Sequence, residues 1–339
     1  MRYAASLAAL SALFGLTLSA SIVLPMRKSV PSKQRLMEIA RSGPRYMKNG
    51  VRMQSGGAPL SLPFMDGRFE LNVTFGNPAQ TFKVELELEW ADAWVVGKEC
   101  DSEACNGNPS LGLPPKHKFD SDASPGFIRG ASYSMSDGPD SCHGYAGTDA
   151  FSIGGVSVSS QQFGVCSSVG KTLEYRNVDG LLGLGIAVDD ETRQAPPLLN
   201  LVQVLDSPLF SIWQQGGPLP FDGVSLGQLS LGALDGLHCD LGTLGYTAMA
   251  VDDSWQFAFT RFAVGSYAST QRQIVQFDAA DGFLNVPTNF LQQIYSLTDG
   301  IYDPDYQQYV TPCSTPKPDL VFTIGGKTYN VTANDYLYP

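Results

Sequence analysis

The chain has 339 residues, of which 43% are apolar and 16% are charged, and its formal net charge is −11. That length and apolar content can bury a large core, as one big domain or as two lobes. The acidic balance argues against a nucleic-acid partner. The 35 glycines and 22 prolines favour turns and short strands over long helices, and we therefore predict an all-β protein.

The first 20 residues have the composition of a signal peptide. Arg2 precedes an almost entirely apolar run from residue 4 to residue 18, and residues 18–20 (Leu-Ser-Ala) offer a cleavage site. The run is shorter than the roughly 20 residues that a membrane helix needs, and an uncleaved N-terminal anchor is the alternative. We predict a chain that is secreted to the extracellular space or to a lysosomal or digestive lumen, with no membrane contact after signal removal.

Residues 21–54 form a basic segment in front of an acidic body. They hold eight basic residues and one acid, whereas the chain from residue 55 onward holds 13 basic and 32 acidic residues. A cationic strip in front of an anionic body can dock on it electrostatically. A disordered basic linker is the alternative.

Two runs of alternating apolar residues predict a β-hairpin. Apolar side chains occupy every second position of residues 69–75 and again of residues 82–90, and residues 76–78 (Gly-Asn-Pro) supply the turn. The polar residues of the second run are expected on a solvent-exposed face of the strand; they are Lys83, Glu85, Glu87 and Glu89.

This hairpin, with its pattern Phe-x-Leu-x-Val-x-Phe-Gly-x-Pro-x-Gln-x-Phe-x-Val before Trp94, resembles the opening hairpin of the pepsin-like aspartic peptidases. In that family the second strand carries a catalytic Asp-Thr-Gly nine residues after the turn proline and seven before the tryptophan. Both counts fall on Glu87, and the tripeptide reads Glu87-Leu88-Glu89. The resemblance implies a bilobal all-β fold, a basic prosegment in residues 21–54, and a monomer with a polypeptide substrate or peptide ligand but no cofactor or metal.

The second catalytic motif of the family also matches in part. The family places another Asp-Thr-Gly nine residues before a proline that opens a helix. Asp278 stands nine residues before Pro287, and residues 288–295 follow as the expected helix. Ala279-Ala280 replaces the Thr and Gly. The alternative interpretation makes Asp278 a turn acid before a glycine, and Glu87 a solvent-facing strand residue.

The chemistry of the family explains why these replacements matter. Two carboxylates within hydrogen-bond distance share one proton and activate a water against a peptide carbonyl. Leu88 and Ala279 lack the hydroxyl that ties the two catalytic loops together, Glu89 adds a bulky acid, and the longer Glu87 displaces its carboxyl group. Since a misplacement of ~1 Å can cost on the order of 100-fold in rate, we predict a catalytically impaired homologue. The alternative is an active acid endopeptidase that uses Glu87 and Asp278.

The flap of the family, a hairpin over the cleft with a tyrosine at a Tyr-Gly-x-Gly tip, is altered in the matching residues 131–142. Spacing from Gly144 places Asp137 at the tyrosine position, and Tyr133 lies nearby in the sequence. The resemblance implies that both residues belong to a flap over the substrate cleft.

Six cysteines in a secreted chain indicate disulfides. The pair Cys142–Cys166 brackets predicted strands that it would join, and the family closes a small loop at the place of Cys100–Cys105. Cys239 and Cys313 either pair with each other or, as in nematode members of the family, with partners further along. Scattered histidines and the absence of a Cys-x-x-Cys motif argue against zinc.

Asn72 and Asn330 each begin an Asn-Val-Thr tripeptide, which is an acceptor for N-glycosylation. Both tripeptides fall in predicted strands, where such matches also arise by chance. We predict glycosylation at both positions.

Two further segments complete the resemblance. Residues 178–185 (Val-Asp-Gly-Leu-Leu-Gly-Leu-Gly) are similar to the segment that the family threads behind its first catalytic strand, and residues 318–329 are similar to a late strand pair. We place the N-terminal lobe at residues 55–215 and the C-terminal lobe at 216–339. No segment matches the last strands of the family, so we expect an incomplete second lobe. The Gly-x-Ser-x-Gly at residues 223–227 lacks the helix that a hydrolase nucleophile requires.

Overall fold

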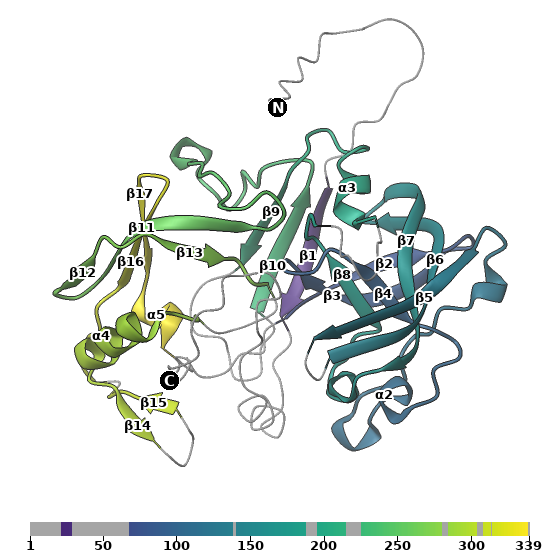
Figure 1. Cartoon of the computed structure of the whole chain (residues 1–339), viewed down its shortest axis with the longest axis horizontal. Coiled ribbons are helices and arrows are strands. Elements are labelled where there is room, and N and C mark those ends of the chain that lie inside the picture. The colour runs from purple at the N-terminus through teal and green to yellow at the C-terminus, as the bar shows by residue number, and fades with distance from the viewer. Residues whose placement is uncertain are drawn as a thin grey trace, which may run out of the picture.

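The computed structural model arranges the chain in two lobes that are built mainly of strands (Figure 1). The predicted all-β, bilobal fold is therefore confirmed. The predicted signal peptide and most of the predicted basic segment lie outside the described residues. The structure describes residues 22–28, 68–137, 140–187, 195–214, 225–279, 284–303, 308–312 and 314–337.

The first lobe is built on a ten-stranded sheet. In chain order its strands are β1 (Ile22–Lys28), β2 (Phe69–Phe75), β3 (Gln80–Glu87), β4 (Ala93–Val96), β5 (Ile128–Asp137), β6 (Asp140–Ile153), β7 (Val156–Val169), β8 (Gly180–Gly183), β9 (Phe210–Gln214) and β10 (Ser225–Leu231). Their order in space is β5-β6-β7-β4-β8-β3-β2-β1-β10-β9, and β6 also pairs with β2. This additional pairing closes the sheet into a barrel from β6 round to β2, which removes open strand edges.

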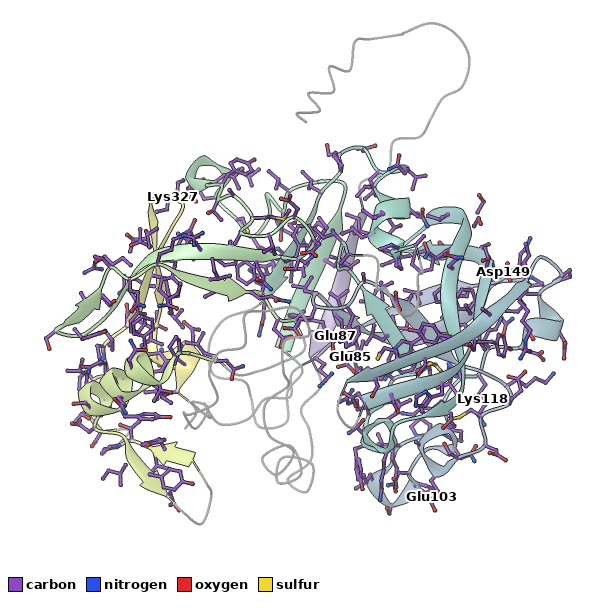
Figure 2. All side chains as sticks on the ribbon, viewed as in Figure 1. Glu85, Glu87, Glu103, Lys118, Asp149 and Lys327 are labelled. Carbon is purple, nitrogen blue, oxygen red and sulfur yellow. A yellow bond between two sulfur atoms is a disulfide. The ribbon has the colours of Figure 1, made fainter. Side chains whose placement is uncertain are left out.

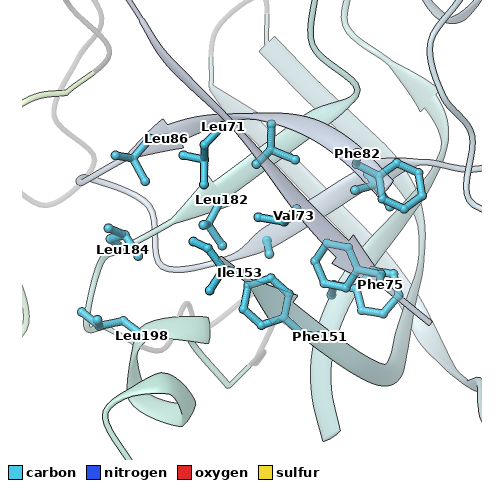
Figure 3. Close-up of a cluster of buried hydrophobic side chains, with 14 of the residues drawn as sticks. Leu71, Val73, Phe75, Phe82, Leu86, Phe151, Ile153, Leu182, Leu184 and Leu198 are labelled. Atoms are coloured by element: carbon cyan, nitrogen blue, oxygen red, sulfur yellow. The ribbon is translucent and has the colours of Figure 1, made fainter. Parts of the chain in front are cut away.

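The predicted hairpin consists of β2 and β3, which pair antiparallel with Val73 opposite Phe82. Because alternate side chains of a strand point to opposite faces, one face of each strand packs into an apolar cluster (Figure 3). We call this cluster the first core. Phe75 is 1% exposed within it and stacks on Phe163 of β7, with the ring centroids 4.2 Å apart.

The prediction that the polar face of β3 is exposed to solvent is wrong at the end of the strand. Glu85 and Glu87 are only 2% and 1% exposed. The reason is the closure of the sheet, because Trp94 of β4, Met135 of β5 and Leu181 of β8, all from the same sheet, line the same pocket as these two glutamates. The two carboxylates therefore need polar partners inside the protein.

Short helical turns connect the strands of the first lobe. One of them, α3, is a single turn that begins after Pro196 and buries Leu198 and Leu201 in the first core. The turns are α2 (Glu103–Asn106), η1 (Pro109–Leu111), η2 (Ser121–Ala123), η3 (Lys171–Tyr175) and α3 (Pro197–Leu201).

The second lobe is a smaller sheet against which one helix packs. Its main strands are β11 (Gln256–Val264), β12 (Tyr267–Ser269), β13 (Gln273–Gln276), β16 (Leu320–Ile324) and β17 (Lys327–Val331), in the order β12-β11-β16-β17 with β13 paired to β11. Helix α4 (Thr288–Thr298) begins after Pro287, as predicted, and its Phe290 stacks on Phe262 of β11. The predicted late strand pair is β16 and β17. The small elements are η4 (Leu241–Thr243), β14 (Ile301–Asp303), β15 (Gln308–Val310) and α5 (Ala333–Tyr336).

The lobe boundary and the completeness of the second lobe stay predictions. Strand β10, which falls in the predicted C-terminal lobe, pairs with β9 and β1 in the first sheet. Ser225, the serine of the Gly-x-Ser-x-Gly pattern at residues 223–227, begins β10. Asn72 of β2 and Asn330 of β17 are both exposed, as an acceptor asparagine must be, and their glycosylation stays a prediction.

Two disulfides are present as predicted, Cys100–Cys105 and Cys142–Cys166. The second one joins β6 to the adjacent strand β7. Cys239 is exposed and has no disulfide partner among the described residues, and Cys313 lies outside them. The predicted pairing of the last two cysteines therefore stays open.

Loss of the Cys142–Cys166 bond should cost more stability than loss of Cys100–Cys105. The two bonds close chain segments with sequence separations of 24 and 5 residues. Chain-entropy estimates for these loops give about 3.5 and about 2 kcal/mol. Urea unfolding of the Cys142→Ala/Cys166→Ala and Cys100→Ala/Cys105→Ala variants measures both costs. The reverse order would contradict an origin in unfolded-state entropy.

Candidate active site

The end of β3 is fixed by the neighbouring strand β8. The two strands run parallel, with Glu87 opposite Gly183. Beyond β8 the chain follows the loop after β3, because Leu184 N donates to Glu87 O at 2.7 Å and Gly185 N donates to Trp90 O at 2.7 Å. Residues 180–185 therefore lie beside β3 and the loop that follows it, and they hold the backbone of Glu87 in place.

Glycine is required where β8 meets its neighbours. A Cβ atom on Gly183 would lie 2.4 Å from Trp90 O, and one on Gly180 would lie 2.1 Å from Trp94 O. Both contacts are with backbone atoms, which cannot move without disturbing the strand pairing. The glycines of this segment therefore permit the close approach that positions Glu87.

Two arginines neutralise the buried carboxylates of β3. Arg68 Nη1 donates to Glu85 Oε1 and lies 3.3 Å from Glu87 Oε1. Arg176 Nη1 lies 3.3 Å from Glu85 Oε2. The side chains of Arg68 and Glu87 are 9% and 2% exposed, so this pairing takes place away from bulk water. Such charge-assisted contacts favour the ionised form of a carboxylate.

Arg176 also connects β3 to the hairpin that β5 and β6 form. Its Nη2 donates to Asp140 Oδ2 at 2.9 Å, and Asp140 also accepts a hydrogen bond from Thr172 Oγ1. Asp140 is the first residue of β6. We call these five charged groups, of which Asp140 and Arg176 are partly exposed, the buried charge cluster: Arg68, Glu85, Glu87, Asp140 and Arg176. Figure 2 shows Glu85 and Glu87 on the side of the first lobe that faces the second.

The two predicted flap residues occupy different environments. Tyr133 of β5 is 2% exposed, and its hydroxyl donates to Asp92 Oδ2 at 3.2 Å. A Cβ atom on Gly164 would lie 2.4 Å from the Tyr133 ring, so the ring lies in the interior of the first lobe. Asp137 ends β5 opposite Asp140, and its side chain lies outside the described set. The binding role of both residues stays a prediction.

The residues that follow Asp278 and Glu87 in the sequence both belong to the first core. Asp278 follows β13 and is half-buried, and the next residue, Ala279, is 8% exposed and belongs to the first core together with Leu88. Trp255 Nε1 also donates to the backbone carbonyl of Leu184, the residue after β8, at 2.8 Å. Both predicted catalytic residues are therefore next in sequence to members of one apolar cluster.

Sequence reasoning missed three members of the site: Arg68, Asp140 and Arg176. Arg176 lies 91 residues from Glu85 along the chain, and Arg68 lies 19 residues from Glu87. Each is a single charged residue without a periodic pattern around it. The sequence holds only an indirect signal for them. Glu85 and Glu87 lie on one strand close to glycine-rich segments, and if other parts of the protein cover that strand, the two carboxylates require buried cations.

No group of three or more histidine, cysteine, aspartate or glutamate side chains is placed to hold a metal in the part of the chain that the structure describes. In that same part, no helix has the length and apolar character to cross a membrane.

Comparison with known proteins identifies clear relatives of the chain. The model of the family described as eukaryotic aspartyl protease matches residues 68–339. Aspartic protease 1 from Caenorhabditis elegans is 32% identical over 331 residues, which cover 94% of this chain and 82% of the relative. Aspartic protease 17 from the same organism is 31% identical over 297 residues, or 86% and 74% of the two chains. Cathepsin E from Oryctolagus cuniculus is 25% identical over 301 residues, or 87% and 72%.

Proposed function

This chain belongs to the eukaryotic aspartyl protease family, and from that premise we propose that it binds peptide segments without hydrolysing them. The family implies a polypeptide as the partner. The proposal concerns the chemical step, for which both family motifs are altered. In this chain the first motif reads Glu87-Leu88-Glu89 and the second reads Asp278-Ala279-Ala280.

The pairing of Arg68 with Glu87 is the observation that carries the proposal. An aspartic dyad works because two adjacent carboxylates share a single proton and so provide one acid and one base. A guanidinium 3.3 Å from Glu87 Oε1, buried with it, stabilises the charged carboxylate and removes the reason for sharing that proton. Glu87 then acts as an ion-pair partner of Arg68.

The residues beside the two acids support the same conclusion. In the family a hydroxyl ties the two catalytic loops together, and here those positions are Leu88 and Ala279. Both side chains are 8% exposed, and both belong to the first core. Apolar side chains of the first core stand where the family has hydroxyls, and they supply no group that orients a catalytic carboxylate.

The proposal predicts that the purified chain does not cleave an unfolded protein substrate between about pH 3 and about pH 6, the range in which carboxylate pairs act. Cleavage would be followed by gel and mass spectrometry, with and without a transition-state inhibitor of aspartic peptidases. Asp278→Asn and Glu87→Gln variants serve as matched controls, since each removes one acid and keeps the shape of the side chain.

Inhibitor-sensitive cleavage that disappears in both variants would overturn the proposal. That result would support the alternative, an active acid endopeptidase in which Glu87 and Asp278 form the dyad. Cleavage that survives both substitutions would instead indicate a contaminating protease, and the preparation would be repeated from a different host.

We also propose that the chain is exported as a monomer. Two disulfides suit an oxidising compartment, and the apolar residues 4–18 have the character of a signal sequence. Relatives named vacuolar protease A and cathepsin E suit a secreted or lysosomal destination.

A further inference from the structure

Strand β1 comes from the predicted basic segment, residues 21–54, but it lies inside the first sheet. All seven of its residues, from Ile22 to Lys28, pair antiparallel with β10. The last residues of β1 also pair with the start of β2, where Lys28 lies opposite Phe69. β1 therefore has a paired strand on each side, and Figure 1 shows it between β10 and the strands of the barrel.

β1 is also the strand that joins β10 to the barrel. The spatial order β2-β1-β10-β9 gives β10 two partners among the described strands, β1 and β9. Within that same set, β9 pairs with β10 alone. Without β1, the pair of β9 and β10 would keep no backbone pairing to the barrel, and an isolated two-stranded unit is marginally stable in water.

The environment of β10 makes the loss of β1 unfavourable. Residues 227–231 of β10 are all buried. Leu229 is 0% exposed in the first core, and Ser230, which points to the opposite face of the sheet, is 2% exposed. Both faces of β10 are therefore covered, so its backbone groups depend on the strands at its two edges for their hydrogen bonds. Loss of β1 would leave one of these edges unpaired in the middle of the sheet.

A side chain of β2 covers the end of β1. Phe69 is 4% exposed, and a Cβ atom on Gly227 of β10 would lie 2.5 Å from Phe69 Cε1. The Phe69 ring therefore reaches from β2 to β10, the two strands that β1 separates in the sheet. The absence of a side chain at Gly227 leaves room for this ring. β1 is thus held along its edges by two strands and on one face by an aromatic ring.

The predicted signal-peptide cleavage site lies directly before β1. Cleavage after Ala20 would make Ser21 the N-terminus, one residue ahead of the strand. Removal of the signal peptide would therefore produce a chain whose first structured residues are those of β1.

We propose that β1 is a permanent strand of the folded protein, and that the mature chain begins at Ser21 instead of being produced by release of residues 21–54. A cut in the connection between β1 and β2 leaves β1 in place as a non-covalently bound strand. The start of the basic segment is then a part of the fold, and not a prosegment that is discarded. This inference is independent of the proposed function, because an inner strand is kept whether or not the chain hydrolyses peptides.

The test is a cut in the connection between β1 and β2. A recognition sequence for a site-specific protease is inserted between Gln54 and Ser55, and the secreted chain is cleaved and passed through a gel-filtration column without denaturant. The proposal expects the N-terminal fragment to co-elute with the rest of the chain, at a one-to-one ratio by mass spectrometry. In urea that unfolds the chain, the two pieces should separate. A fragment that leaves without denaturant, while the rest of the chain keeps its urea midpoint, would overturn the proposal.

Val23→Pro/Leu24→Pro, with the same inserted site, is the matched variant. Adjacent residues of a strand direct their N–H groups to opposite sides, so one of the two prolines removes an N–H that faces β10. The dissociation constant of the fragment, measured by dilution of the cleaved complex, should rise about tenfold or more, the effect of one unmade hydrogen bond at a buried site. Equal retention in this variant would mean that other residues hold the fragment, and would overturn the proposal.

A second measurement needs no variant. N-terminal sequencing of the unmodified secreted chain should give Ser21, or else a later N-terminus accompanied by an equal amount of the β1 fragment. Secreted protein that begins after Lys28 and lacks the fragment would overturn the proposal. Neither measurement depends on peptide hydrolysis, so proteolytic activity of the chain would overturn the proposed function and leave this inference intact.

Discussion

Replacement of Arg68 by methionine should destabilise the first lobe by about 3–5 kcal/mol, the usual cost of removing one partner from a buried ion pair. Methionine preserves the apolar stem of the side chain but leaves Glu85 and Glu87 without the guanidinium that contacts both. Both glutamates are almost fully buried, so water cannot replace the lost contact. Urea unfolding followed by tryptophan fluorescence measures the change.

Arg272→Met is the matched control for this prediction, because Arg272 is exposed and an exposed substitution usually changes stability by less than about 0.5 kcal/mol. The origin of the effect is tested by pH. A buried carboxylate without its cation is unfavourable only while it is ionised, so the gap between Arg68→Met and the unmodified chain should narrow as acid protonates the glutamates. A loss below about 1 kcal/mol at neutral pH would contradict a structural role for the pair.

The buried charge cluster explains how the site of an aspartyl protease can be kept folded when its catalytic motif is changed. In an unaltered site the carboxylates are stabilised by each other and by a shared proton. Here Arg68 contacts Glu85 and Glu87, and Arg176 connects Glu85 of β3 to Asp140 at the turn end of the β5–β6 hairpin. Under the proposed function, the contact of Arg68 with Glu87 is also the one that withdraws Glu87 from proton transfer.

Local patterns in the sequence predicted the backbone that carries the site. The alternation in residues 69–75 and 82–90, with a turn between them, indicated the β2–β3 hairpin, and the glycines of residues 178–185 indicated β8 beside it. The strands follow from the pattern of neighbouring residues, and the close approach of β8 follows from glycines, which have no side chain. Both can be read directly from the sequence.

The environment of Glu87 could not be predicted in the same way. Alternation assigned Glu85 and Glu87 to solvent because the pattern describes a single strand and carries no information about the other strands of the closed sheet that pack against it. The cover comes from β4, β5 and β8, and one of the compensating cations, Arg176, lies 91 residues from its partner Glu85. Contacts of that range follow from the closed fold and leave no local pattern. The same holds for Tyr133, whose hydroxyl reaches Asp92 across 41 residues.

Replacement of Phe75 by alanine should destabilise the chain by about 3–5 kcal/mol, the typical range for a buried aromatic residue in a core. Phe75 is 1% exposed at the end of β2, and its ring contacts Phe151 and Phe163 at centroid distances of 5.1 and 4.2 Å. These rings come from three different strands of the barrel, so the void cannot close without moving a strand. Phe277→Ala is the matched control, because Phe277 is 62% exposed and its loss should cost far less.

A double-mutant cycle separates the stacking of Phe75 on Phe163 from the burial of either ring. If the rings interact directly, Phe75→Ala and Phe163→Ala together should cost less than the sum of the single changes, by about 0.5–1.5 kcal/mol. Free energies of unfolding of the four proteins give this coupling. Strict additivity would mean that each ring acts only through the area it buries. A coupling in the expected range would show that direct stacking of the two rings joins β2 to β7 within the first core.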